Sequence, residues 1–346
     1  MNDYRTEHKD YREYVAIMVS TDRKVFDEGS AVRIRMVEYA RLYKSLLIVV
    51  FSTERHDPVE IAPNATLYST NSLSRLRYVP DARRIGKKLI RKIEKETPIV
   101  LICQDPFETG LVGKALSALR KNIELVVQIH TDIFSPYFFK HSFLNKVRIG
   151  ISKGVLPHAD RVQVVSRRIA DSLGARGVAS ESIVLKPVVV DVDRFASTPP
   201  SFDLHERFPH FKKIVMMASR LEPEKNIEAA ISAWEKVHTE FPDAGLIIIG
   251  SGSLSKSLAH TAKKLGLEKS IVFLDWQADL VPYYKGSDLF LLTSFFEGYG
   301  MTLKEAEACG TKILSTDVGI AREVGATSIP GFESNDIAQA LIYQLK

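Results

Sequence analysis

Residues 289–310 read LFLLTSFFEGYGMTLKEAEACG, and this stretch indicates how the chain folds. It opens with a short apolar run of strand length, and a turn with two glycines follows. A helical pattern then begins near Met301 and stops at Gly310, a residue suited to end a helix. A strand that passes through such a turn into a helix is the repeating unit of a parallel α/β sheet. The first amides of that helix have no partner inside it, so they predict an anion site suited to a phosphate.

Two carboxylates of this stretch are placed where they can act on one ligand. Glu297 lies inside the glycine turn, and Glu305 lies within the helix, about one turn along. One carboxylate can therefore face a sugar while the other reaches the hydroxyls of a ribose. The alternative is a capped amphipathic helix whose glutamates are merely solvated. The position of Glu297 disfavours that alternative, because a glycine-lined turn does not need an acid for structural reasons.

The same alternation of apolar runs and helical patterns extends through the chain. In the first half the predicted strands are 14–20, 47–51, 99–103, 125–130, 161–165 and 183–186. In the second half they are 214–218, 246–250, 271–274, 289–293 and 312–315. A break with two adjacent prolines, 197–200, lies between the halves. We therefore predict an α/β protein of two Rossmann-like domains in tandem, 1–198 and 199–346, which face a cleft where the carboxyl ends of the strands bind ligands.

Length and composition exclude several classes of protein. The chain has 346 residues, 45% of them apolar, which is enough to bury the cores of two domains. Cys103 and Cys309 lie in different halves and form neither a disulfide framework nor a zinc motif, which favours a reducing compartment. Residues 1–13 are too polar for a secretory signal, and the apolar runs are too short to span a bilayer. We therefore expect a cytoplasmic protein that is not integral to a membrane.

The net charge of +5 is unevenly distributed. Residues 1–195 hold 32 Lys and Arg against 23 Asp and Glu, whereas residues 196–346 hold 15 against 19. Much of the excess lies in 81–96, where seven basic side chains accompany an apolar helical stripe. One interpretation of this stretch is an ordinary solvated helix face.

The other interpretation of the basic stretch is attraction to an acidic acceptor or to an anionic membrane, such as the inner face of the plasma membrane. Each basic residue near such a surface contributes about 1 kcal/mol. The aromatic and basic stretch 134–153 can help there, or it can be an ordinary helical hairpin at the edge of the cleft. We expect no nucleic acid partner, since no reader motif accompanies the charge.

Other strand ends of the second half carry groups that suit a diphosphate. Arg220 and Lys225 lie in the loop after the predicted strand 214–218, where a guanidinium fork and an ammonium can neutralise phosphate. Gly250 and Gly252 follow the next strand and let the backbone approach a ligand. These glycines also resemble part of a dinucleotide fingerprint, but the third glycine is absent, which disfavours a dehydrogenase.

Taken together, these motifs resemble those of the family 4 retaining glycosyltransferases, which have the GT-B fold. Glu297 and Glu305, with seven residues between them, resemble the E-x7-E signature of that family. The other matching motifs are Arg220 with Lys225 (R-x4-K), Gly250 to Gly252 (G-x-G) and 159–166 (AD-x-V…VS). They occur in the family's order across most of the chain.

The resemblance implies roles for residues of the second domain. Arg220 and Lys225 would neutralise the donor diphosphate as the leaving group acquires charge. Glu305 would accept hydrogen bonds from the ribose, and Glu297 would contact the transferred sugar. The other implied donor-binding residues are Gly250, Gly252, Gly298, Tyr299, Gly300, Met301, Thr302 and, near the base, Trp276.

In the first domain the resemblance implies an acceptor side. His130 ends a predicted strand and resembles the histidine of the family's strand-end His-Asp pair, which contacts the sugar. Without the resemblance, a lone histidine is more often structural. Gly29 and Ser30 open a helical stretch and resemble the family's glycine-rich loop near the acceptor and the phosphate. Asp105 follows another predicted strand and is a further candidate.

The resemblance therefore implies a retaining hexosyltransferase that moves a sugar from a nucleotide-diphosphate donor to a glycan or lipid-linked acceptor, as in polysaccharide biosynthesis. The donor stays open among UDP-, GDP- and ADP-sugars. We expect neither a cofactor nor a metal, because the D-x-D pattern at Asp191 and Asp193 falls in a structural segment of the family, near the linker. Two other hypotheses remain: a catalytically silent sensor of nucleotide sugars or glycans, and a phosphorylase or nucleotide-sugar epimerase of the same fold.

The sequence departs from the family pattern in three places. Pro187 and Val188 stand where the family often has Asn-Gly, so that turn must differ. Asp275 stands where the family has a glycine, which leaves the contacts to the base open. The chain stops at Lys346, whereas the family usually adds a helix that packs back on the first domain, so we expect either a short form or a truncated one.

Overall fold

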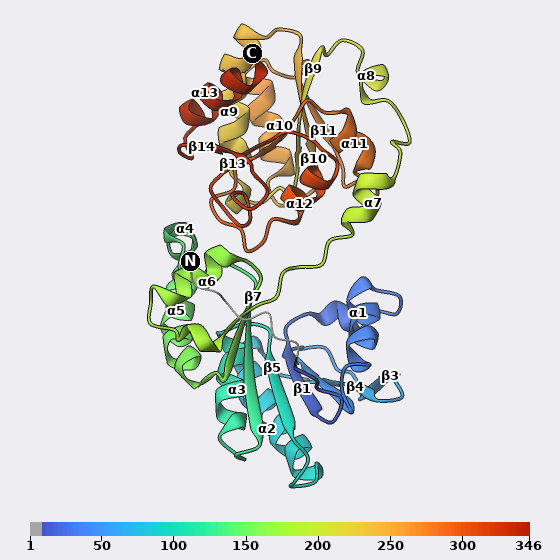
Figure 1. Cartoon of the computed structure of the whole chain (residues 1–346), viewed down its shortest axis with the longest axis vertical. Coiled ribbons are helices and arrows are strands. Elements are labelled where there is room, and N and C mark those ends of the chain that lie inside the picture. The colour runs from blue at the N-terminus through green and yellow to red at the C-terminus, as the bar shows by residue number, and fades with distance from the viewer. Residues whose placement is uncertain (1–8) are drawn as a thin grey trace. The chain divides into compact units, whose positions relative to one another are not determined.

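The computed structural model describes residues 9–346, which divide after Lys186 into two compact units (Figure 1). Each unit is a largely parallel sheet with helices, so the predicted fold class of two tandem Rossmann-like units is confirmed. The boundary differs from the predicted one after Thr198. The reason is that α7 (Val192–Ser197) packs against α12 (Met301–Ala308), a helix of the second unit.

The first unit is built on an eight-stranded sheet in the order β3-β4-β2-β1-β5-β6-β7-β8. Its strands are β1 (Val15–Ser20), β2 (Ser45–Val50), β3 (Val59–Ala62), β4 (Ala65–Ser69), β5 (Ile99–Cys103), β6 (Ile123–Ile129), β7 (Arg161–Val164) and β8 (Ile183–Leu185). All neighbours pair in parallel except β3 and β4, which form an antiparallel edge. These two strands were not predicted.

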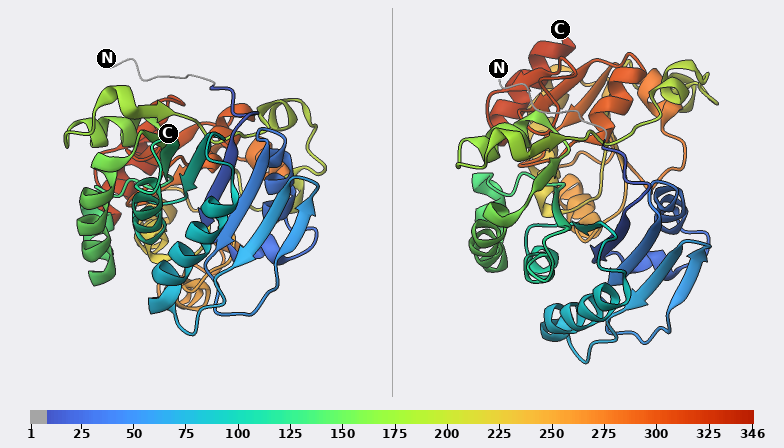
Figure 2. Two further views of the ribbon diagram at one scale, coloured as in Figure 1. Left: turned by 90° about the horizontal axis from the view of Figure 1, so that it is seen from below. Right: turned by 60° about the horizontal axis from the view of Figure 1, so that its bottom comes forward.

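Helices cover both faces of the first sheet. They are α1 (Ala31–Ala40), α2 (Tyr78–Lys92), α3 (Glu108–Ser117), α4 (Pro136–His141), α5 (Phe143–Val155) and α6 (Arg167–Gly174), with short 3-10 turns η1 (Arg23–Phe26), η2 (Arg75–Arg77), η3 (Leu156–His158) and η4 (Ser180–Ser182). The helices α2, α3 and α5 pack side by side, and α1 lies on the opposite face (Figure 2). Successive residues of β5 accordingly face different layers. Ile102 packs with Met36 of α1, whereas Cys103 lies against Gly113 of α3.

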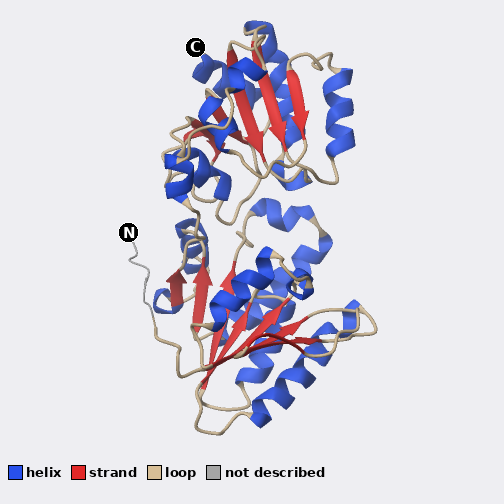
Figure 3. Cartoon of the chain, turned by 90° about the vertical axis from the view of Figure 1, so that its right-hand side faces the viewer, coloured by secondary structure: helices blue, strands red, loops and turns tan. Residues whose placement is uncertain are grey.

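The second unit holds a six-stranded sheet in the order β11-β10-β9-β12-β13-β14, whose strands run in parallel (Figure 3). The strands are β9 (Lys213–Ala218), β10 (Ala244–Ile249), β11 (Ile271–Leu274), β12 (Leu289–Leu292), β13 (Ile313–Thr316) and β14 (Thr327–Ile329). The other helices are α8 (Leu204–Arg207), η5 (Pro223–Lys225), α9 (Ile227–Glu240), α10 (Ser255–Lys264), α11 (Val281–Gly286) and α13 (Ser334–Leu345).

The central strand β9 shows why these sequences are apolar at nearly every position. Val215 and Met217 belong to one core, together with Trp234 of α9. Met216 belongs to a second core on the other face, together with Leu303 of α12. A parallel strand that is covered on both faces reads as a continuous apolar run, which is the pattern found in the sequence.

Each sheet has one point where the strand order reverses. In the first sheet this point lies between β1 and β5, and in the second it lies between β9 and β12. At such a point the loops that leave the carboxyl ends of the two strands diverge and leave room for a ligand. The fold therefore predicts a ligand site at the loops after β9 and β12.

Within residues 9–346, none of the helices is both long and apolar enough to cross a membrane.

Candidate functional site

Lys225 and Glu297 form an ion pair at the switch point of the second sheet. Lys225 lies in the loop after β9 and Glu297 in the loop after β12, and Nζ of Lys225 lies 2.5 Å from Oε1 of Glu297. Each side chain is only 13% exposed. The hydroxyl of Ser294 donates a second hydrogen bond to the same oxygen at 2.8 Å. The structure thus brings together two residues that the sequence predicted, and the partly buried carboxylate is held in one orientation.

The loop that carries Lys225 is fixed through its backbone by the loop after β12. The hydroxyl of Thr293 donates to the carbonyl of Lys225 at 2.9 Å and to that of Asn226 at 3.2 Å. The amide of Phe295 donates to the carbonyl of Glu224 at 2.9 Å. The position of the ammonium therefore depends on the adjacent strand as well as on its own loop.

The glycine loop after β10 packs against the same β9 loop. The amide of Leu221 donates to the carbonyl of Ser251 at 2.9 Å. A Cβ atom at Gly250 would lie 1.9 Å from the carbonyl oxygen of Ser219, and one at Gly252 would lie 2.3 Å from that of Leu221. Contact between two backbones thus accounts for both glycines. The sequence also predicts that Gly250 and Gly252 let the backbone approach a ligand, and this role stays a prediction.

Arg220 has a different partner from Lys225. Its guanidinium lies 2.7 Å from a carboxylate oxygen of Glu224, and its side chain is 71% exposed. An exposed ion pair of this kind contributes about 0–1 kcal/mol, so Arg220 can turn toward a phosphate at little cost. Glu222 binds the amide of Ser253 at 2.9 Å and its hydroxyl at 2.6 Å, which lowers the pKa of Glu222 and joins the two loops.

Glu305 is held by a tyrosine that the sequence analysis did not single out. The hydroxyl of Tyr284, in α11, donates to Oε2 of Glu305 at 2.9 Å. Tyr284 is fully buried, and burial keeps its own pKa far above the ordinary value, so it remains a donor. Burial also raises the pKa of Glu305, while the hydrogen bond from Tyr284 acts in the opposite direction. A buried tyrosine usually requires a polar partner for its hydroxyl. This requirement is the only feature of the sequence that could have indicated the role of Tyr284.

The glycine turn before α12 has the predicted form. Gly300 has a φ of 87° and precedes the helix, which begins at Met301, and no side chain caps it. Gly319 was not identified from the sequence. It has a φ of 51°, and a Cβ there would lie 2.2 Å from the carbonyl oxygen of Tyr299. At the start of α12 the amide of Leu303 donates to the carbonyl of Gly300 at 3.0 Å, and the amides of Met301 and Thr302 before it, beside Gly298 and Tyr299, are the ones predicted to bind an anion.

Trp276 follows β11 and is 71% exposed. The neighbouring Gln277 donates to the backbone carbonyl of Asp275 at 3.0 Å and accepts a 3.3 Å hydrogen bond from the hydroxyl of Tyr283. The loop is therefore anchored beside the tryptophan. An indole face that is exposed in this way suits stacking on a base, and this role remains a prediction.

The candidates of the first unit follow three adjacent strands, β1, β5 and β6. Gly29 has a φ of 76°, and the hydroxyl of Ser30 accepts the amide of Arg33 at 3.2 Å, so Ser30 caps α1. The carboxylate of Asp105 accepts the amides of Phe107 and Thr109 at 2.7 and 3.3 Å. Both polar side chains therefore have a structural duty, and their predicted role near the acceptor stays untested.

His130 lies just beyond β6, and its Nε2 is 3.4 Å from the side-chain oxygen of Gln128. Desolvation by the surrounding protein lowers the pKa of His130, and the positive charge of Arg35 lowers it further. The neutral ring is thus favoured at physiological pH. A neutral imidazole can donate or accept one hydrogen bond, as contact with a sugar hydroxyl requires.

The D-x-D pattern has a local structural explanation. The carboxylate of Asp191 accepts the amide of Arg194 at 3.1 Å and caps α7. Within residues 9–346, no three His, Cys, Asp or Glu side chains are grouped so that they could hold a metal ion.

Comparison with known proteins identifies the family. Residues 203–336 match the family described as "Glycosyl transferases group 1", and residues 45–194 match "Glycosyltransferase Family 4". N-acetyl-α-D-glucosaminyl L-malate synthase of Bacillus anthracis is 34% identical over 270 residues, which are 77% of this chain and 69% of the relative. The chain belongs to the family 4 glycosyltransferases.

Two further comparisons bear on this glycosyltransferase. A protein of Escherichia coli named UDP-Gal:α-D-GlcNAc-diphosphoundecaprenol α-1,3-galactosyltransferase is 30% identical over 44% of this chain and 41% of its own. Several other curated relatives are likewise matched over less than two thirds of their length. The crystal structure of HepE of Anabaena in complex with UDP and glucose has a TM-score of 0.69 and 19% identity, and covers 96% of this chain and 90% of that one. The GT-B fold is therefore confirmed.

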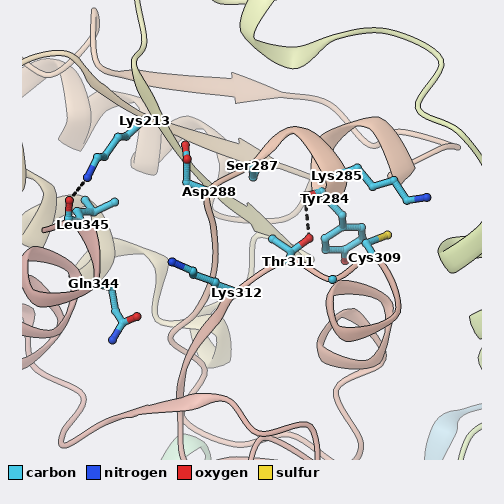
Figure 4. Close-up of a pocket in the computed structure, with 11 residues that line it drawn as sticks. Lys213, Tyr284, Lys285, Ser287, Asp288, Cys309, Thr311, Lys312, Gln344 and Leu345 are labelled. Atoms are coloured by element: carbon cyan, nitrogen blue, oxygen red, sulfur yellow. Dashed lines mark hydrogen bonds between the residues drawn. The ribbon is translucent and has the colours of Figure 1, made fainter.

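A separate pocket of the glycosyltransferase lies at the amino ends of the strands of the second sheet, with Tyr284 and Cys309 among its walls (Figure 4). Its volume is about 340 Å³, and its walls include Lys213, Asp288 and Lys312, which stand at or next to the starts of β9, β12 and β13. Lys213 is bonded to the carbonyl of Leu345. Because ligands of doubly wound sheets bind at the carboxyl ends of strands, this pocket at the amino ends is not the donor site.

Replacing Tyr284 with phenylalanine should weaken donor binding and shift its pH dependence. The change removes a hydrogen bond to a carboxylate, worth about 1.5–3 kcal/mol, so we expect the donor KM to rise about tenfold or more. It also removes the bond that lowers the pKa of Glu305, so that pKa rises further above its usual range. The ionised carboxylate is the form predicted to accept the ribose hydroxyls, and on that prediction affinity should start to fall at a higher pH in the variant as the solution is acidified. Donor KM measured against pH tests this, with Tyr343→Phe at an exposed position of α13 as the control.

Proposed function

We propose that this glycosyltransferase moves a sugar from a nucleotide-diphosphate donor to a glycan or lipid-linked acceptor, with retention of anomeric configuration and without a metal ion. The ion pair of Lys225 and Glu297 carries the proposal. It places a cation and an acid at the switch point of the second sheet, next to the free amides of α12. A diphosphate needs the cation and the amides, and the sugar attached to it needs a hydrogen-bond acceptor within reach.

The proposed donor is a UDP-sugar, with GDP- and ADP-sugars as alternatives. Two comparisons favour UDP: HepE was crystallised with UDP and glucose, and the name of the Escherichia coli relative specifies UDP-galactose. That name also specifies an acceptor linked to undecaprenol through a diphosphate, which supports a lipid-linked acceptor. Such an acceptor resides in a membrane, so we further propose that the enzyme works at the cytoplasmic surface of the plasma membrane.

In the proposed reaction the bond between the anomeric carbon and the donor phosphate breaks. Lys225 and Arg220, with the amides at the start of α12, balance the charge on the departing diphosphate. The acceptor oxygen forms its bond to the anomeric carbon on the same face, and its proton passes to the departing phosphate oxygen. Glu297 orients the sugar, and Glu305 orients the ribose. The described side chains around the switch point supply the positive charge that a metal would otherwise supply.

The test is a transfer assay with UDP-, GDP- and ADP-sugars and a lipid-linked glycan acceptor. We expect release of the nucleoside diphosphate and undiminished turnover in EDTA. The anomeric configuration of the product, axial or equatorial as measured by NMR, should be the same as that of the donor. A donor at 100 times its dissociation constant should also stabilise the fold by about 2.7 kcal/mol. Glu297→Gln keeps the shape of the side chain and should lose transfer while it retains donor binding.

Each rival hypothesis has its own signature in this assay. A silent sensor would be stabilised by a donor without any turnover. A phosphorylase would need inorganic phosphate, and an epimerase would convert the donor without consuming an acceptor. An inverted product, or activity that EDTA abolishes, would contradict the proposed mechanism.

A further inference from the structure

The hairpin formed by α4 and α5 exposes an apolar surface in the first unit. The side chain of Phe143 is 79% exposed, Leu144 is 53% exposed, and Val147 is 46% exposed. These three residues lie within about one turn of α5, so their side chains form one patch. Phe139 of α4, 45% exposed, adds a second ring to the hairpin. Exposed apolar groups that gather in this way mark a contact surface, whereas single ones do not.

The charged residues of α4 and α5 are all basic, and Arg148 of α5 is paired with Glu108 of α3 at 3.1 Å. No Asp or Glu occurs anywhere between Asp132 and Asp160, a stretch that includes both helices. Lys146 Nζ lies 5.2 Å from the centre of the Phe139 ring, and Lys140 Nζ lies 6.0 Å from that of Tyr137. Lys153, on the same side of α5 as Lys146, is exposed. The apolar patch is therefore rimmed by cations.

We propose that the α4–α5 hairpin is a membrane-docking surface, which inserts Phe143, Leu144 and Val147 at the interface of an anionic bilayer. Apolar side chains at this depth leave water, while the surrounding lysines meet the lipid phosphates. The hairpin follows His130 and β6 closely in sequence, so docking brings the acceptor side of the unit to the bilayer. The inference rests on the proposed function only in explaining why a lipid surface is needed.

The basic helix α2 is the rival surface within the same unit, and its composition suits a bilayer less well. Between Tyr78 and Lys92 it has no exposed large apolar side chain. Asp81 lies 3.4 Å from the guanidinium of Arg84 and 3.7 Å from that of Arg77, and its carboxylate offsets part of the positive charge of α2. Just before it, Leu73 and Leu76 are 91% and 92% exposed, but they are two side chains at a three-residue 3-10 turn and not part of the face of a longer helix.

A second copy of the chain is a poorer occupant of the patch than a lipid surface. A symmetric dimer would bring the patch against itself, and its lysines would then face one another. Facing like charges oppose association, whereas an anionic bilayer attracts them. The sign of the charge thus selects the bilayer.

The face of the hairpin continues toward a pocket at the end of α5. This pocket has a volume of about 670 Å³ and is lined by Phe134, Leu156, Pro157 and Val178, with Lys153 and Arg176 among its walls. Apolar walls beside cations suit the glycerol region and phosphate of a lipid. The pocket therefore extends the docking surface from the patch along the helix.

The experiment compares binding of the full chain to vesicles of phosphatidylcholine with and without phosphatidylglycerol. The wild type should sediment with the anionic vesicles and far less with the neutral ones. Phe143→Ser with Leu144→Ser removes two large apolar side chains from the inserted surface, so even partial insertion predicts at least about a tenfold loss of vesicle binding. The matched control is Leu73→Ser with Leu76→Ser, which removes two more exposed side chains and should bind as the wild type does. Circular dichroism checks that both variants fold.

The outcomes separate this inference from the proposed function. Unchanged binding of the Phe143/Leu144 variant overturns the inference, and so does loss of binding in the Leu73/Leu76 control alone. If the wild type is a dimer that the hairpin variant dissociates and neither binds vesicles, the surface contacts protein instead. Transfer to a water-soluble acceptor should be equal in wild type and hairpin variant. If the wild type binds vesicles but transfers no sugar to any acceptor, the proposed function fails and the docking surface stands.

Discussion

Replacing Lys225 with alanine is expected to lower kcat/KM by about 10²–10³-fold, the usual loss when one preorganised stabilising group is removed. The change removes a cation that lies at the point where the donor diphosphate is proposed to bind. It also leaves the carboxylate of Glu297, only 13% exposed, without the ammonium that lies 2.5 Å away. A carboxylate without its counterion repels a diphosphate, so the effect on donor binding is larger than the loss of one contact. Steady-state kinetics with the donor varied measure it.

Three controls identify the cause of that loss. Lys225→Arg keeps the charge and should restore part of the activity, although the planar guanidinium fits a small, enclosed site less well. Arg220→Ala should cost less, about tenfold, because Arg220 is 71% exposed and already paired with Glu224. Lys225→Ala combined with Glu297→Ala should be more stable to heat than Lys225→Ala alone, since no unpaired charge remains. A Lys225→Ala enzyme with kcat/KM within about threefold of the wild type would contradict the assigned role.

The apolar strands of the two sheets could be predicted from sequence because parallel strands are buried on both faces. Every residue of β5 and of β10 is buried, and each strand appears as an unbroken apolar run. The strands β3 and β14 were missed because they are short edge strands with half-exposed or exposed positions, and β4 was missed because polar residues interrupt its apolar pattern. The domain boundary was missed for another reason. Adjacent prolines indicated a linker, but the ring of Phe195 just before them packs 6.1 Å from that of Tyr284.

The site shows the same limit of sequence reasoning. Lys225 and Glu297 were both predicted as functional residues. They belong to two different motifs, and neither motif shows that the two side chains touch. Tyr284 and Gly319 were not identified, because each acts on a residue that is distant or unremarkable in the sequence: Tyr284 on Glu305, and Gly319 on the backbone of Tyr299. Local patterns thus give the positions that are predicted to bind a ligand. The groups that hold those positions in place require the structure.

Replacing Gly250 with alanine is expected to destabilise the fold by about 3 kcal/mol or more. Gly250 has a φ of 141°, which residues other than glycine rarely adopt. The added Cβ would also lie 1.9 Å from the carbonyl oxygen of Ser219. Backbone strain costs about 1–3 kcal/mol, and overpacking costs a similar amount. The clash cannot be relieved locally, because Gly250 donates its amide to Leu274 and Ser219 donates its amide to Ile249. Urea unfolding with a fixed slope measures the change.

Gly266→Ala is the matched control for this prediction. Gly266 also has a positive φ, 71°, but a Cβ there would meet no atom within 4 Å. Its replacement should therefore cost only the left-handed conformation, about 1–2 kcal/mol, and should leave kcat/KM unchanged. Gly250→Ala should lower kcat/KM as well, because it displaces the loop that ends at Lys225. Equal losses of stability in the two variants would mean that the β9 loop moves away freely, and the close contact of the two backbones would then not fix the ammonium of Lys225.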